Sequence, residues 1–339
     1  MKYTYSVIIV VQNINSQIAA LNFLRQLPSH QKPSEILICT GKNPSIQRNI
    51  GMNLCRHSIV YFLDDDSLVP PSTPDYLLSH FHDPRTAVAG GPNLHPPDST
   101  DFEKTVSAVL ASWMGSFKVR NRYSSIGAVK EASEKDLILC NLMIRKNIFQ
   151  SEGGFRTKLY PNEENEFLNR LLHKGCRLVY DPRAVIFRHR RKNIFAFCLQ
   201  SFRYGRGRAQ QFKVYPCMSD LIHFVPLFFS LYVMTLVGLS ASHFPRLPWV
   251  LISSTFTWFI PIMLFVLLTQ LTSIFAISWT RKSKDIFLIP FLIFLRHFFY
   301  GIGMIYGLIC PINLRLCTVD VYRVYWKNAK PIFRRIPTK

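Results

Sequence analysis

The segment Val60-Tyr61-Phe62-Leu63-Asp64-Asp65-Asp66 is the most informative stretch of this chain. An apolar run typical of a buried strand ends in consecutive aspartates, within a chain of 339 residues whose formal net charge is +21. Carboxylates this close repel one another and stay ionised together only when a cation lies among them. A divalent metal is the usual cation, so the segment predicts a phosphate donor held by metal.

Two similar apolar runs, residues 5–11 and 35–39, precede this segment and leave room for a helix between successive runs. Alternating strands and helices predict a mostly parallel sheet with right-handed crossovers. Ligands gather at the carboxyl ends of strands in such sheets. The polar residues after the runs are therefore candidates for one site: Gln12 and Asn13, then Thr40, Gly41 and Lys42, then Asp64 to Asp66.

The aspartates have two explanations when the motif is taken alone. A turn or a helix N-cap accounts for them as well as a metal site does. Their position after a buried strand favours the metal site. If the strand geometry continues, Asp64 and Asp66 point to the same side, which makes them the better pair for metal and sugar-nucleotide contact.

A second acidic cluster, Glu163-Glu164-Asn165-Glu166, precedes residues with the apolar spacing of a helix. Acidic residues are common in a first helical turn because the helix dipole favours them. A catalytic role requires one carboxylate to face the cleft as general base for an acceptor hydroxyl. The glycines of Gly153-Gly154-Phe155 predict a loop that shapes the helix start. The cluster alone leaves both explanations open.

Taken in order, these segments resemble the family 2 glycosyltransferases with a GT-A fold. The similarity spans residues 1–215, and the later Phe202-Arg203-Tyr204-Gly205-Arg206-Gly207-Arg208-Ala209 resembles the membrane-attached subgroup that contains the succinoglycan glucosyltransferase ExoA. The motifs that carry the family resemblance are residues 5–13, Arg48-Asn49-Ile50-Gly51, Phe62 to Asp66, Gly153-Gly154-Phe155 and residues 163–170.

The resemblance implies an inverting sugar transfer in which Asp64 and Asp66 hold Mn²⁺ or Mg²⁺. It implies that the nucleotide-sugar donor, with a UDP-sugar favoured, contacts Gln12, Asn13, Arg48, Asn49, Asp64 and Asp65. Glu164, with Glu163 beside it, falls where the family has the Asp that deprotonates the acceptor.

The chain also departs from the family pattern. Cys39-Thr40-Gly41 stands where the family commonly has an Asp that contacts uracil or ribose, and the QxxRW motif of related membrane transferases is absent from the sequence.

Basic residues cluster downstream of these motifs. Residues 188–192 predict a juxtamembrane positive belt beside anionic headgroups. Arg203, Arg206 and Arg208 alternate with Tyr204, Gly205 and Gly207, which predicts a shaped loop that binds the donor diphosphate or a lipid-linked pyrophosphate acceptor. Basic charge beside membrane segments, without a nucleic-acid-binding motif, argues against a nucleic-acid partner.

The C-terminal part of the chain is apolar, with runs at residues 221–241, 247–278 and 286–311. Each reaches or exceeds the roughly 20 helical residues that cross a bilayer. We therefore predict a catalytic domain over 1–215, with an interface segment at 186–215, a membrane region of about three or four segments over 216–314, and a basic tail over 315–339.

Together these features predict a multi-pass inner-membrane glycosyltransferase with a cytosolic catalytic domain. It would transfer a sugar to a lipid-linked saccharide in the synthesis of a bacterial surface polysaccharide. A processive polysaccharide synthase and a catalytically silent relative that organises a membrane assembly are the alternatives.

Overall fold

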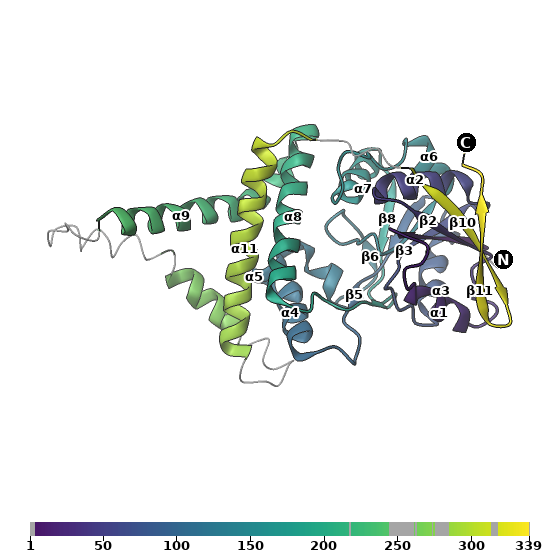
Figure 1. Cartoon of the computed structure of the whole chain (residues 1–339), viewed down its shortest axis with the longest axis horizontal. Helices are drawn as coiled ribbons and strands as arrows, with labels where there is room; N and C mark the ends of the chain where they lie inside the picture. Colours follow the sequence, from purple (N-terminus) through teal and green to yellow (C-terminus); the bar gives the residue numbers. More distant parts are fainter. Residues whose placement is uncertain are drawn as a thin grey trace. The chain divides into compact units, whose positions relative to one another are not determined.

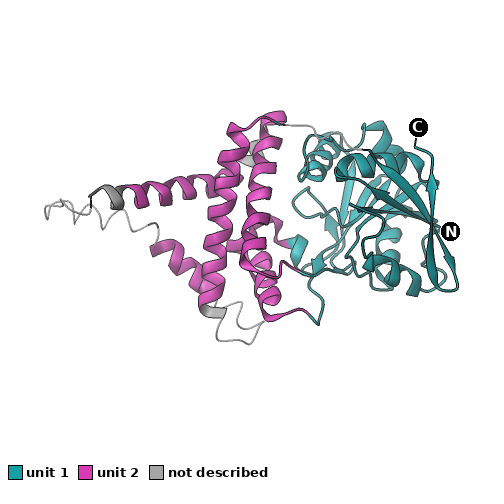
Figure 2. Cartoon of the chain, viewed as in Figure 1, with its two compact units in different colours: residues 1–98, 121–189, 312–339 teal, residues 99–120, 190–311 magenta. Residues whose placement is uncertain are grey.

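The computed structural model describes residues 4–216, 218–243, 261, 263–272, 274, 285–312 and 318–338 (Figure 1). The chain divides into two compact units (Figure 2). The α/β unit contains Met1–Asp98, Asn121–His189 and Ile312–Lys339. The helical unit contains Ser99–Arg120 and Arg190–Pro311. Residues 190–215, expected at the end of the catalytic domain, thus pack with the helices.

A nine-stranded mixed sheet forms the centre of the α/β unit, in the order β11-β10-β2-β1-β3-β7-β4-β8-β6. The pairs β2-β1, β1-β3 and β4-β8 are parallel, and the other neighbours are antiparallel. The predicted α/β fold class is confirmed, although the sheet is mixed where a mostly parallel one was expected. Its strands are β1 (Tyr5–Val11), β2 (Glu35–Thr40), β3 (Ile59–Asp64), β4 (Thr86–Gly90), β6 (Lys130–Glu131), β7 (Asn141–Arg145), β8 (Arg177–Tyr180), β10 (Asp320–Lys327) and β11 (Lys330–Ile336).

Helices cover both faces of this sheet because successive β1 residues point to opposite sides. Val7 and Ile9 pack in a core with α1 and α3, whereas Ile8 packs in a second core with α2 and α7. A small parallel sheet of β5 (Asn93–Leu94) and β9 (Ile186–Phe187) lies in the same unit. Its helices are α1 (Ala19–Gln26), α2 (Pro44–Leu54), α3 (Thr73–Ser79), α6 (Lys146–Ser151) and α7 (Glu163–His173).

The helical unit is built around the long helices α8 (Ile194–Val214) and α11 (Asp285–Ile309), whose backbones approach closely at glycine residues. A Cβ on Gly205 would lie 1.9 Å from the carbonyl oxygen of Tyr300, and one on Gly303 would lie 2.1 Å from that of Phe202. Any larger residue would therefore push the two backbones apart. The helices of this unit are α4 (Asp101–Ala111), α5 (Trp113–Ser116), α8 (Ile194–Val214), α9 (Val225–His243), α11 (Asp285–Ile309) and the short Met263–Thr272.

The C-terminal hairpin belongs to the central sheet, although the sequence places 315–339 outside the α/β domain as a basic tail. Strand β10 pairs antiparallel with β2, and Asp320 lies opposite Thr40. Arg323 Nε donates to Glu35 Oε1 at 2.8 Å, and the Glu35 carboxylate is buried. A basic side chain thus neutralises an acid inside the sheet, which its charge alone does not reveal.

This ion pair should anchor the hairpin. Arg323→Ala removes the cation that donates to the buried Glu35 and leaves only the more distant Arg56 Nε, at 3.9 Å from the same oxygen, while the hydrogen bonds from Ser6 Oγ and Arg56 N remain. We therefore expect a loss of about 1–3 kcal/mol in stability. Thermal unfolding of the detergent-solubilised protein measures it. Arg335→Ala is the matched control on the same hairpin, since Arg335 pairs with Asp320 at the surface. An equal effect of both changes would contradict the anchoring role.

Candidate active site

The three central strands bring the predicted polar clusters to one edge of the sheet. In the parallel register, Val11 at the end of β1 lies beside Thr40 at the end of β2, and Val10 lies beside Asp64 at the end of β3. Gln12 and Asn13 follow β1 and are exposed. The convergence predicted for these carboxyl ends is therefore present.

Asp64 and Asp66 converge on one guanidinium group, that of Arg188. Arg188 Nη1 lies 2.7 Å from Asp64 Oδ2, while Arg188 Nε donates to Asp66 Oδ1 at 2.6 Å. Both aspartates thus face a shared cation. They do so across a turn, because β3 ends at Asp64 and Ser67 N donates to Asp64 O at 3.1 Å, so the continued strand geometry expected for this pair is absent. Asp65 lies between them, and burial together with the charges of Asp66 and Asp64 raises the pKa of its carboxyl group.

Arg188 is a site residue that the sequence did not reveal, because we expected residues 188–192 to form a positive belt at the membrane. It directly follows β9, and its backbone N–H donates to Leu94 O of β5 at 2.8 Å. This two-stranded sheet turns the side chain toward the acidic residues. The expectation for Arg188 is wrong, because the two-residue strand β9 that precedes the basic run is too short to be visible in the sequence.

Arg48 joins the two acidic clusters of the sequence. From the buried face of α2, Arg48 Nη2 donates to Asp64 Oδ1 at 3.2 Å and Arg48 Nη1 donates to Glu163 Oε1 at 3.0 Å. Pairing of buried charges in this way stabilises them only when both partners stay in place. The aspartates after β3 and the start of α7 therefore form one connected site.

The acidic residues of α7 divide into different environments. Glu163 is buried, its Oε2 has no hydrogen-bond partner, and burial followed by the charge of Glu164 raises its pKa to about 7. Glu166 is also buried and accepts hydrogen bonds from Arg156 and Arg170. Glu164 is half-buried. Of these acids, Glu164 is the most exposed, and its role as base stays a prediction.

Asn49 holds a loop in place with its side-chain amide. Asn49 Nδ2 donates to Phe155 O at 2.8 Å, and Phe155 N donates to Asn49 Oδ1 at 2.9 Å. The adjacent Gly154 has a φ of +70°, and a Cβ there would lie 2.9 Å from Asn49 Oδ1. Two predicted motifs thus bind each other, which gives Asn49 a structural role beside its predicted contact with the donor.

The arginines Arg203, Arg206 and Arg208 lie on α8 in the helical unit, not in the shaped loop that the sequence suggests. Gly205 serves the close approach of α11 and does not bend the chain. Arg208 is buried and donates to Gln211 Oε1 at 3.3 Å. Their contact with a diphosphate stays a prediction.

The start of β10 also reaches the carboxyl edge of the sheet. Asp320 pairs with Thr40. The neighbouring Gly41 has a φ of +151°, and a Cβ on it would lie 3.1 Å from the Thr318 carbonyl oxygen. The hairpin therefore delivers an acidic residue beside the stretch where the family Asp is missing. No local pattern in the sequence predicts this pairing, because it joins segments near the two ends of the chain.

The acidic pair fits a divalent metal. Asp64 and Asp66 already share one cation, and their hard oxygen atoms suit Mg²⁺ or Mn²⁺. Within the described ranges, no group of three His, Cys, Asp or Glu side chains could hold a metal. The protein can thus offer two carboxylates, which leaves the other positions to water and to donor phosphates, as is usual for Mg²⁺.

A helix-flanked α/β sheet with acidic residues after a central strand defines the class of GT-A nucleotide-sugar transferases. The fold is similar to that of the mannosyltransferase PcManGT from Pyrobaculum calidifontis, solved in complex with GDP-Man and Mn²⁺. The TM-score is 0.55 at 11% sequence identity, and the match covers 91% of this chain and 88% of that chain.

Sequence comparison places the chain within this class. Residues 59–277 match the glycosyl transferase family group 2, and the chain belongs to this family. It is 26% identical over 184 residues to the pre-mycofactocin glycosyltransferase of Mycobacterium tuberculosis, in both the CDC 1551 and the H37Rv strains. That match covers 50% of this chain but only 35% of the relatives, so the chain spans about a third of their length.

The contacts of Arg48 with Asp64 and Glu163 predict what it costs to remove the cation from a buried acid. Arg48→Met should destabilise the protein by about 3–5 kcal/mol, because Glu163 is left buried without its cation. Burial raises the pKa of Glu163 to about 7 while Arg48 lowers it, so removing Arg48 should raise this pKa further. The loss of stability caused by Arg48→Met should therefore grow as pH rises through about 7, where the wild-type carboxyl group ionises and that of the variant stays protonated at a cost.

Adding Glu163→Gln to Arg48→Met removes the stranded charge and should recover part of the stability. Thermal unfolding across pH, arranged as a double-mutant cycle, measures the coupling. Purely additive effects would show that the two side chains do not depend on each other.

Proposed function

We propose that the protein is a membrane-anchored inverting glycosyltransferase that transfers one sugar from a nucleotide-diphosphate donor to a lipid-linked saccharide. The observation that supports this most is the connected set Asp64, Asp66, Arg48 and Glu163, with Glu164 at its accessible end. It combines a place for a metal and a diphosphate with a carboxylate for the acceptor. Such a set contains what sugar transfer requires.

In this proposal, Asp64 and Asp66 would hold Mn²⁺ or Mg²⁺, which supplies positive charge to the leaving diphosphate. Glu164 accepts the proton of the acceptor hydroxyl as its oxygen forms the bond to the anomeric carbon. The bond from that carbon to the diphosphate oxygen breaks on the opposite side, which inverts the configuration. Glu163 and Arg48 keep the start of α7 close to the end of β3.

The donor class is supported by PcManGT, which was solved with GDP-Man and Mn²⁺. A UDP-sugar remains the donor that the sequence favours, and the subgroup that contains ExoA remains the resemblance that suggests a surface polysaccharide. The apolar helices and the arginines on α8, whose guanidinium groups suit a pyrophosphate, support a lipid-linked acceptor.

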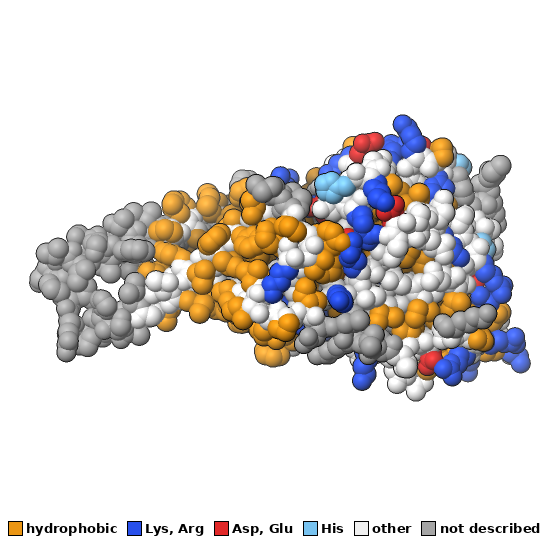
Figure 3. All heavy atoms as spheres, turned by 90° about the horizontal axis from the view of Figure 1, so that it is seen from above, with side chains coloured by type: hydrophobic (Ala, Val, Ile, Leu, Met, Phe, Trp, Pro, Cys, Tyr) orange, Lys and Arg blue, Asp and Glu red, His pale blue; other side chains and the backbone are white. Residues whose placement is uncertain are grey.

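Membrane anchoring is supported by exposed apolar side chains. Two helices are long and apolar enough to cross a membrane, at Leu221–Gly238 and Phe287–Ile309, and only 11% of the first is buried within the protein. Figure 3 shows apolar side chains over the surface of the helical unit. A core helix of a soluble protein would be mostly buried, so the exposure of α9 favours lipid as its neighbour.

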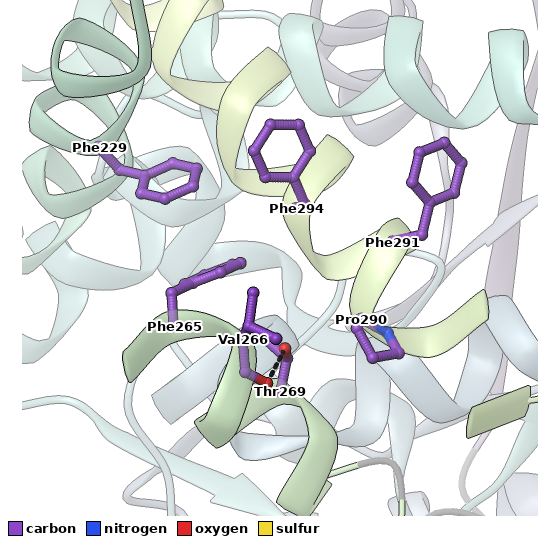
Figure 4. A pocket seen from close by; sticks show the side chains of 7 residues that line it. All are labelled: Phe229, Phe265, Val266, Thr269, Pro290, Phe291 and Phe294. Atoms are coloured by element: carbon purple, nitrogen blue, oxygen red, sulfur yellow. Dashed lines mark hydrogen bonds between the residues drawn. The ribbon is translucent and has the colours of Figure 1, made fainter. Parts of the chain in front are cut away.

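The charged pair in α11 turns inward, as expected for a membrane helix. The buried Arg296 donates from Nε to Gly115 O at 2.5 Å, and His297 Nε2 lies 2.8 Å from Met114 O. An apolar pocket of about 190 Å³ also lies between α9, the short helix Met263–Thr272 and α11. Phe229, Phe265 and Phe294 point toward one another there (Figure 4). Polar groups thus meet protein partners, while the remaining surface suits hydrocarbon.

The hairpin constrains the number of crossings. Because β10 belongs to the same sheet as β1 and β2, the chain must return to the side of the membrane from which it departs after His189. The number of crossings in the proposed topology is therefore even. If α9 and α11 each cross once, the apolar run 247–278, which lies largely outside the described residues, contributes either no crossing or two.

Donor turnover tests the catalytic proposal. With detergent-solubilised protein, a panel of nucleotide sugars and membrane-lipid extract as acceptor, we expect turnover of one donor that requires Mn²⁺ or Mg²⁺ and stops with chelator. Asp66→Asn should lose this metal-dependent turnover. Glu164→Gln should lower the rate by about 10²–10⁴-fold because it removes the base.

Glu131→Gln is the matched control, since Glu131 is an exposed acid that pairs with Arg177. Wild-type rates in both site variants would refute the assigned roles. A long polymeric product would replace single transfer with processive synthesis.

Membrane sidedness tests the even number of crossings. Small tags placed before Met1 and after Lys339 should both be protected from protease in vesicles that expose the periplasmic face, and both should be cleaved when the vesicles are inverted. The shared sheet gives this expectation its physical reason. Tags on opposite sides would show that the proposed topology is wrong.

A further inference from the structure

Arg188 takes up the oxygen atoms that a metal would need. Its Nε and Nη2 donate to the two oxygens of Asp66 at 2.6 and 3.1 Å, and its Nη1 lies 2.7 Å from Asp64 Oδ2. The remaining oxygen of Asp64 accepts from Arg48 at 3.2 Å. Every carboxylate oxygen of the acidic pair is therefore held by an arginine.

A metal and this guanidinium cannot use the pair in the same way at once. A divalent ion requires carboxylate oxygens at about 2 Å and brings two positive charges into the same space. The guanidinium lies in contact with those oxygens and is always charged. Arg188 must therefore give up at least part of its contacts when a metal binds.

The backbone of Arg188 limits how far its side chain can go. Its N–H donates to Leu94 O at 2.8 Å, and the preceding Phe187 exchanges hydrogen bonds with Leu68 at 2.9 Å in both directions. The side chain is mostly enclosed, with 23% of it exposed. Once displaced, the guanidinium stays beside the aspartates, where the nearest new anion is the diphosphate that arrives with the metal.

We propose that Arg188 is a positioning residue that neutralises Asp64 and Asp66 until metal and donor arrive, and then binds the donor diphosphate. This inference rests on the proposed function of the acidic pair. It assigns two effects of opposite sign to one side chain. Arg188 weakens the binding of metal alone, and it strengthens the binding of a nucleoside diphosphate in the presence of metal.

The experiment measures free Mn²⁺ by electron paramagnetic resonance during titration of the full chain in detergent, first alone and then with UDP or GDP. Arg188→Gln should bind Mn²⁺ alone at least about tenfold more tightly than the wild type, because a competing cation is gone. With Mn²⁺ saturating, the same variant should bind the nucleoside diphosphate at least about tenfold more weakly, because a bidentate phosphate ligand is lost.

Three variants separate the possible explanations. Arg191→Gln makes the same change of charge at an exposed side chain and should change neither affinity. Asp66→Asn combined with Arg188→Gln should abolish the gain in Mn²⁺ affinity, which locates that gain at the acidic pair. Arg188→Lys keeps one charge without the planar fork and should fall between wild type and Arg188→Gln, so it tests the proposal if Arg188→Gln does not fold.

Failure of this inference differs from failure of the proposed function. If Asp66→Asn weakens Mn²⁺ binding while Arg188→Gln and Arg188→Lys leave it unchanged, the metal site stands and the role of Arg188 is wrong. A parallel loss of both affinities in the Arg188 variants also overturns it, because that is the result of a merely structural role. If Asp66→Asn changes no affinity, both proposals fail together.

Discussion

Negative charge crowded at the carboxyl edge of the central sheet is the constraint on which the site depends. Asp64 ends β3, Asp66 lies in the turn after it, and Glu163 begins α7, so the fold places acids where burial is costly. Arg48 and Arg188 offset this charge from two other elements. Strand β3 and helices α2 and α7 must therefore assemble together with β9, because each supplies charge that the others need.

The helical unit solves a similar problem with backbone atoms. Arg296 lies within a helix apolar enough to cross a membrane, and its guanidinium is satisfied by the Gly115 carbonyl and the Ser116 hydroxyl. These partners come from α5, a segment that the chain sends out between β5 and β6. A short excursion from the catalytic part thus completes the packing of the helices. The division into two units follows packing and does not follow the order of the sequence.

Local patterns predicted what depends on local physics. Strands β1, β2 and β3 and the start of α7 were found because apolar alternation and helix spacing are visible in short windows. Asp64 and Asp66 face one cation across a turn, so this pairing does not arise from the strand alternation that the sequence suggested. Arg188, the pairing of β10 with β2 and the continuous α8 were missed. Each depends on a partner far away in the chain: Arg188 lies 122 residues from Asp66, and Arg323 lies 288 residues from Glu35.

The late position of β10 has a consequence for biosynthesis. Until the ribosome has made residues 320–336, strand β2 has an open edge and the buried Glu35 lacks Arg323. The α/β unit must therefore wait, incompletely closed, while the apolar helices are synthesised. An open strand edge is a template for unwanted pairing. A nascent chain that stalls within its apolar region would leave this edge exposed, which makes it a natural substrate for chaperones and proteases.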